Sequence, residues 1–109
     1  MICTNTIEYN KLVRDRIPEI IQAKGDVCVV RTLDDDEYRM RLKMKLMEEV
    51  MEYQESGSLE ELADIYEVIR ALAAAEGVCS EELETLRAQK AVNNGEFNRR
   101  LFLIRVDQA

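Results

Sequence analysis

The sequence predicts a mainly α-helical protein whose single domain spans residues 1–109. Three observations lead to this prediction: apolar residues recur at helical spacing in two long segments, a glycine follows each segment, and only two residues connect them. So short a connection forces the two helices into an antiparallel hairpin. We expect a third helix to join this hairpin and to complete a four-helix-type bundle when copies of the chain assemble.

Two helices are predicted in the first half of the chain. The first is short, over residues 17–24, because Pro18 suits an initial helical position and Gly25 suits a C-terminal stop. The second is long, over residues 35–56, and the acidic residues 34–36 supply its N-cap and a favourable charge in its first turn.

The second half is predicted to hold two further helices. Gly57 ends the first long helix, and Ser58 caps the next, which extends to about residue 76. Ser80 caps a third helix that reaches about residue 92. Two apolar runs outside the helices are candidate short strands, near residues 27–33 and 101–106.

Composition narrows the function classes. The net charge of −7 argues against a nucleic-acid polymer as partner, because its phosphates would be repelled. The absence of histidine excludes Ser–His and Cys–His catalysis and histidine metal ligands. Cys3, Cys28 and Cys79 form no CxxC pair, so we expect reduced thiols in a cytoplasmic protein. No run is long and apolar enough for a transmembrane helix, and no membrane partner is expected.

Each long helix carries carboxylates on its apolar face. In the first helix Glu49 falls inside the apolar arc and Glu52 at its edge, and in the second helix Glu61 and Asp64 hold similar places. Burying a carboxylate is costly unless it is paired or bound to a metal. Because the hairpin brings the two faces together, the sequence predicts a site for a hard divalent cation, Mg²⁺ or Mn²⁺.

Two simpler interpretations of these carboxylates stay open at the level of sequence. Glu61 lies three residues after Ser58, the spacing of a capping box, and its carboxylate would then serve the helix end. Glu48 and Glu49 would form an ordinary charged helix face if they were paired with Lys45.

The two acidic motifs match a known family. The Glu-Glu-x-x-Glu segment at residues 48–52, followed by Glu-x-x-Asp at residues 61–64, resembles the all-α nucleoside triphosphate pyrophosphohydrolases, also called MazG-like. The opening segment at residues 9–18 and the segment at residues 63–69 look like the phosphoribosyl-ATP pyrophosphohydrolase-like branch of that superfamily. The resemblance extends from about residue 9 to residue 102.

The resemblance implies an activity and roles for particular residues. Glu49, Glu52, Glu61 and Asp64 would bind Mg²⁺, and Glu48 would hold or deprotonate a water. The reaction would be Mg²⁺-dependent cleavage of a nucleoside triphosphate to monophosphate and pyrophosphate, in nucleotide-pool house-cleaning. The alternatives are phosphoribosyl-ATP pyrophosphohydrolase of histidine biosynthesis, a non-catalytic helical interaction module, and a nucleotide-binding regulator with a decayed site.

Basic residues are candidates for binding the substrate phosphates. Lys11, Arg14 and Arg16 suit this role because guanidinium and ammonium groups pair with phosphate oxygens, and Lys90 is a weaker candidate on the same argument. They would otherwise pair with the acidic body of the protein.

The chain departs from the family in two places. Only eight residues separate Glu52 from Glu61, so the loop that shapes the base pocket in larger relatives is missing. Residues 94–97 read Asn-Gly-Glu-Phe where relatives carry an Arg-Gly-Gly-Phe-like segment, which brings a phosphate contact there into question.

A second apolar stripe on the first long helix predicts self-association. Its four methionines are spaced four, three and four residues apart, as one helix face requires. A chain of this length has too few elements to cover both faces of that helix, so we expect a homodimer or a homotetramer. The stripe consists of Met40, Met44, Met47 and Met51.

Overall fold

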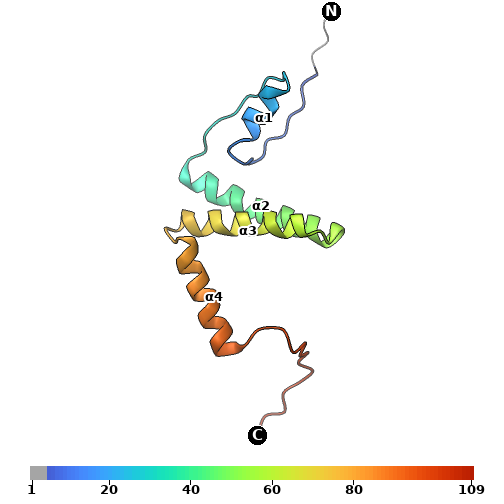
Figure 1. Ribbon diagram of the computed structural model, residues 1–109, viewed down its shortest axis with the longest axis vertical. Coiled ribbons are helices and arrows are strands. Elements are labelled where there is room, and N and C mark those ends of the chain that lie inside the picture. Colours follow the sequence, from blue (N-terminus) through green and yellow to red (C-terminus); the bar gives the residue numbers. More distant parts are fainter. Residues whose placement is uncertain (1–4) are drawn as a thin grey trace, which may run out of the picture.

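The computed structural model describes residues 5–109, and its helical content confirms the predicted fold class. Cys3, one of the three expected thiols, lies outside the described residues. Four helices follow one another along the chain (Figure 1): α1 Ile17–Ala23, α2 Asp35–Ser56, α3 Leu59–Ala75 and α4 Ser80–Asn94.

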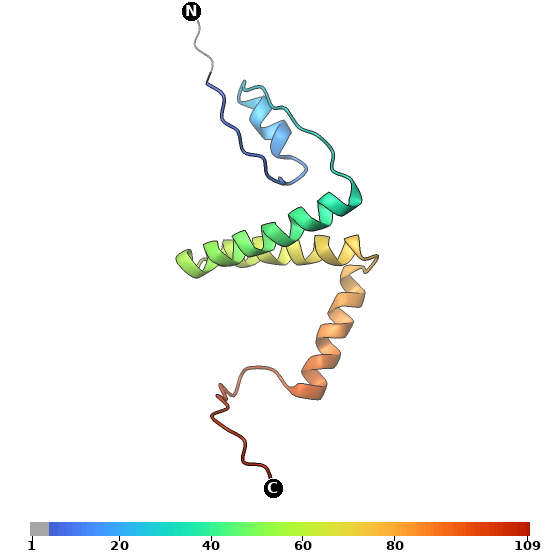
Figure 2. The ribbon, with the colours of Figure 1, turned by 180° about the vertical axis from the view of Figure 1, so that it is seen from behind.

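Helices α2 and α3 lie side by side as the predicted antiparallel hairpin (Figures 1 and 2). The side chain of Asp34 starts α2 by accepting a hydrogen bond of 2.9 Å from the Glu37 N–H. Gly57 ends α2 in the left-handed conformation, at φ 66°, which glycine adopts without steric cost. At the opposite end of the hairpin, Arg39 of α2 donates to the carbonyl of Ala75, 2.8 Å away, and so caps the C-terminus of α3.

The rest of the chain extends away from the hairpin. Segment 5–33, with α1, lies on one side of it, and α4 leads away on the other together with the C-terminal segment 95–109 (Figures 1 and 2). The molecule measures 79 × 32 × 23 Å. Its radius of gyration is 19.8 Å, whereas a compact chain of this length would have about 13 Å. Among residues 5–109 only two apolar side chains are buried, Leu42 and Val68.

Some predicted details are wrong. Residues 27–33 and 101–106 form no strands within the described chain. The physical reason is that both runs are largely exposed and have no neighbouring strand to satisfy their backbone hydrogen bonds. The short helix ends at Ala23, one residue early, and α4 ends at Asn94, two residues late.

The start of α4 also differs from its prediction. Cys79, not Ser80, is the N-cap, and its side chain makes no capping hydrogen bond. The Ser80 hydroxyl instead accepts a hydrogen bond of 2.9 Å from Nε of Arg70 on α3. In residues 5–109 no helix combines the length and apolar character that crossing a membrane requires.

Candidate metal centre

Three carboxylates from the two hairpin helices meet at one place. Glu49 of α2 and Glu61 and Asp64 of α3 each offer an oxygen, and these oxygens lie within 4.8 Å of one another. Glu49 is buried, and the other two are half-buried. Glu52, the fourth predicted ligand, is exposed and is not one of these three, although it interacts electrostatically with both Glu49 and Glu61.

The local fold leaves the Glu61 carboxylate without a capping role. The Ser58 hydroxyl accepts a hydrogen bond of 3.3 Å from the Glu61 N–H, which is half of a capping box. The reciprocal half is missing, because the Ser58 N–H donates to the hydroxyl of Ser56, 3.2 Å away. The interpretation of Glu61 as the second partner of a capping box is therefore wrong.

Lys45 supplies one counter-ion to the cluster. Its ammonium lies 3.4 Å from Oε1 of Glu49, one helical turn away, so the predicted pairing of Lys45 with Glu49 is present. This pair does not make an ordinary solvated face, because the side chain of Glu49 is only 9% exposed. The other oxygen, Oε2 of Glu49, is buried without a hydrogen-bond partner among residues 5–109, as is Oε2 of Glu61.

Two buried carboxylate oxygens without hydrogen-bond partners are more typical of a cation-binding site than of a packed protein core. Buried polar atoms normally have partners, and each exception needs an explanation such as a bound ion or water. An all-oxygen donor set is what Mg²⁺ and Mn²⁺ prefer. Glu49, Glu61 and Asp64 could hold such an ion between α2 and α3.

The electrostatics of the cluster oppose its full ionisation. Burial raises the pKa of Glu61, and the neighbouring Glu49 raises it further. The close approach of the Glu49 carboxyl group raises the pKa of Glu52 first, and the negative charge of Glu49 raises it further. The charge of Glu48, which is exposed and lies one helical turn before Glu52, also raises the pKa of Glu52. A divalent cation would relieve these penalties.

The four predicted phosphate-binding residues occupy different surroundings. Arg14 reaches the cluster, because its guanidinium donates a hydrogen bond of 2.7 Å to Oδ1 of Asp64. Lys11 lies over the ring of Tyr9, with 5.6 Å between its ammonium and the ring centroid. Arg16 and Lys90 are both exposed outside the cluster. Arg16 pairs with Glu19 at 3.6 Å, and Lys90 belongs to α4.

The contact of Arg14 with Asp64 is an instance of the alternative in which these basic residues pair with the acidic body of the protein, but the sequence did not identify Asp64 as the partner. Fifty positions separate the two residues, and no periodic pattern links a segment before α1 to a position on α3. The sequence shows only that Arg14 is a basic residue in an acidic chain, which is equally compatible with a phosphate and with a carboxylate as its partner.

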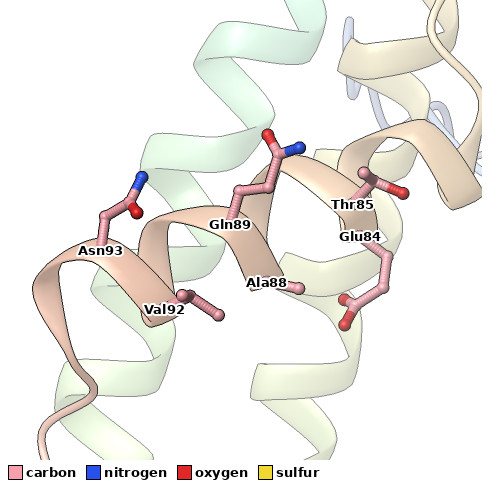
Figure 3. A pocket seen from close by; sticks show the side chains of 6 residues that line it. All are labelled: Glu84, Thr85, Ala88, Gln89, Val92 and Asn93. Atoms are coloured by element: carbon pink, nitrogen blue, oxygen red, sulfur yellow. The ribbon is translucent and has the colours of Figure 1, made fainter.

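A hollow of about 580 Å³ lies elsewhere, along α4. Figure 3 shows that its lining side chains all project from this one helix, so the hollow is an exposed groove and not an enclosed pocket. It contains none of the clustered carboxylates, which lie on the hairpin. The groove is lined by Glu84, Thr85, Ala88, Gln89, Val92 and Asn93.

Comparisons with known proteins give one partial match. No known family and no solved structure match the chain. A protein from Mycolicibacterium smegmatis, described as uncharacterized, is 62% identical over 42 residues, which cover 38% of this chain and 43% of that protein. The match thus spans less than half of the length of this relative.

Proposed function

We propose that this protein hydrolyses a nucleoside triphosphate to monophosphate and pyrophosphate in a reaction that depends on Mg²⁺ or Mn²⁺, and that it serves nucleotide-pool house-cleaning in the cytoplasm. The observation that carries the proposal is the meeting of Glu49, Glu61 and Asp64 across the hairpin, with two buried oxygens that lack partners. The resemblance of the two acidic motifs to the MazG-like enzymes supports it.

In the proposed reaction the clustered acidic residues bind the metal ion, and a neighbouring glutamate accepts a proton from water. A bound Mg²⁺ would neutralise charge on the polyphosphate and would lower the pKa of a bound water. Glu49, Glu61 and Asp64, with Glu52 beside them, would hold the ion. Glu48 accepts the proton of the water whose oxygen attacks the α-phosphorus, while the α–β anhydride bond breaks and pyrophosphate leaves. No covalent nucleophile is needed, which suits a chain without histidine.

Basic groups at the N-terminus complete the proposed site. Arg14 lies beside Asp64, close enough to reach a phosphate of a nucleotide bound at the cluster. Lys11 and Arg16 belong to the same segment and would neutralise the leaving pyrophosphate. Lys90 lies on α4, whereas the carboxylates lie on α2 and α3, so Lys90 would have to reach the nucleotide from a separate helix.

A pair of variants tests the assignment. Glu49→Gln should lose pyrophosphate release by at least about a hundredfold, because the variant lacks a charged ligand at the centre of the cluster. The matched control is Glu60→Gln, which removes the same charge from an exposed position next to Glu61 and should keep wild-type activity. Equal activity of both variants would contradict the proposal.

We also propose that a second copy of the chain covers the methionine stripe. Met40, Met44, Met47 and Met51 are 50–65% exposed. The accessible surface of the chain is 10,367 Å², whereas a compact monomer of this mass would expose about 6,200 Å². The excess of about 4,200 Å² per chain is more than the roughly 1,000–2,500 Å² per partner that obligate interfaces commonly bury, so it leaves ample surface for such an interface. It supports a homodimer or a homotetramer in which hairpins of different copies form the four-helix-type bundle.

Other functions make different predictions. Phosphoribosyl-ATP pyrophosphohydrolase shares the proposed chemistry, and a parallel assay with phosphoribosyl-ATP and nucleoside triphosphates separates the two. A helical interaction module is favoured by the exposed apolar run at residues 101–106. Such a module would show no response to Mg²⁺, whereas the proposed enzyme would bind it.

A further inference from the structure

Segment 5–33 touches the candidate metal centre through one arginine. The guanidinium of Arg14 donates a hydrogen bond of 2.7 Å to Oδ1 of Asp64. Among the described residues, α1 packs against no other helix, and ion pairs join the N-terminal segment to the hairpin: Arg31 pairs with Glu37 at the start of α2, and Arg14 pairs with Asp64 at the carboxylate cluster. The segment is therefore tied to the hairpin at one of the three carboxylates that would bind the metal.

Two protein cations serve these carboxylates, and they differ in freedom to move. Lys45 is held one helical turn from Glu49, and its side chain is only 20% exposed. Arg14 belongs to an irregular segment, and its side chain is 57% exposed. An exposed ion pair is weak and is readily exchanged for a better partner. Arg14 is thus the cation that can leave the cluster.

We propose that Arg14 is an exchangeable counter-ion, which pairs with Asp64 before metal binds and moves to a phosphate group when the metal and a polyphosphate occupy the centre. This inference rests on the proposed function. A divalent cation beside Asp64 weakens the attraction of that carboxylate for Arg14, while a phosphate offers the guanidinium a bidentate partner. The segment that carries Arg14 would then act as a strap over the bound triphosphate.

Two binding measurements on the full-length chain test the exchange. The first is the Kd of Mg²⁺ without nucleotide, by calorimetry. The second is the Kd of inorganic tripolyphosphate at saturating Mg²⁺, a probe that carries the phosphates without the unidentified base. In Arg14→Gln, Mg²⁺ should bind about two- to fivefold more tightly, because a competing exposed ion pair is gone. Tripolyphosphate should bind at least about fivefold more weakly, since a charged partner is lost.

Two further variants make the result specific. Lys24→Gln removes a positive charge from the same segment at an exposed position and should change neither Kd. Arg14→Lys keeps the charge without the fork, so it should retain the wild-type Mg²⁺ affinity and bind tripolyphosphate more weakly than wild type.

The outcomes separate this inference from the proposed function. Weaker or unchanged Mg²⁺ binding by Arg14→Gln, with normal binding by wild type, would overturn the exchange and leave the metal centre standing. Unchanged tripolyphosphate binding would refute the transfer to phosphate. Failure of the wild-type protein to bind Mg²⁺ at all would overturn the proposed function, and the exchange with it.

Discussion

Mg²⁺ should stabilise the folded chain, because the cluster of like charges forms only when α2 and α3 pack together. A ligand that binds only the native state, at about a hundred times its Kd, stabilises that state by about 2.7 kcal/mol. The chain has 109 residues, so its entropy of unfolding is about 230 cal/mol/K at about 2.1 cal/mol/K per residue. These values together predict a rise in melting temperature of about 12 °C.

The assay is thermal unfolding followed by circular dichroism, in chelator and over a series of Mg²⁺ concentrations. Glu49→Gln should lose the Mg²⁺-dependent rise. It should still fold in chelator, because it lacks a charge that repels Glu61 and keeps an amide next to Lys45. Glu60→Gln should respond to Mg²⁺ like wild type, since it lies outside the cluster.

Two results would contradict the binding of Mg²⁺ at Glu49. An equal rise in Glu49→Gln would mean that Mg²⁺ binds elsewhere on the acidic surface. Unfolding of Glu49→Gln in chelator would mean that the ion pair of Glu49 with Lys45 is required for folding, and that the carboxylate is structural.

Three other perturbations have expected outcomes. Folding raises the pKa values of Glu61 and Glu52, so in metal-free protein these carboxyl groups favour the folded state while they are protonated. Their contribution to stability is complete below the unfolded pKa of about 4.3 and is lost as the pH rises through the higher pKa values of the folded state. Urea unfolding in chelator between pH 4 and pH 8 should therefore show Glu61→Gln gaining stability relative to wild type as pH rises, and a constant difference would count against the shift. Met47→Lys should reduce the mass found by light scattering, whereas Met47→Leu should not, and an unchanged mass in the lysine variant would exclude the stripe as the interface. Asp34→Ala should lower the free energy of unfolding by about 1 kcal/mol, because the Glu37 N–H loses its capping partner. An unchanged midpoint of urea unfolding would show that this cap does not contribute to stability.

Local chemistry explains which parts of the fold were predictable from sequence. The bounds of α2 were predicted correctly because Asp34 and Gly57 act within one helical turn, as an N-cap acceptor and a left-handed stop. The placement of Glu49 among apolar residues was predictable for a similar reason, since helical periodicity alone puts it on the packed face.

Features that depend on distant partners were not predictable in this way. A β-branched run such as residues 27–33 forms a strand only if another strand lies beside it, and the described chain offers none. The pairing of Ser58 N–H with Ser56, instead of with Glu61, depends on the geometry of the turn at Gly57. The contact between Arg14 and Asp64 joins segments fifty positions apart, which no local rule connects.

The identity of the inorganic product distinguishes a pyrophosphohydrolase from other phosphohydrolases. A panel of canonical and modified nucleoside triphosphates would be incubated with the protein in Mg²⁺, in Mn²⁺ and in chelator, and the products would be identified by ³¹P NMR. We predict pyrophosphate and nucleoside monophosphate in equal amounts from at least one substrate, with no turnover in chelator. Release of orthophosphate, or full activity in chelator, would contradict it.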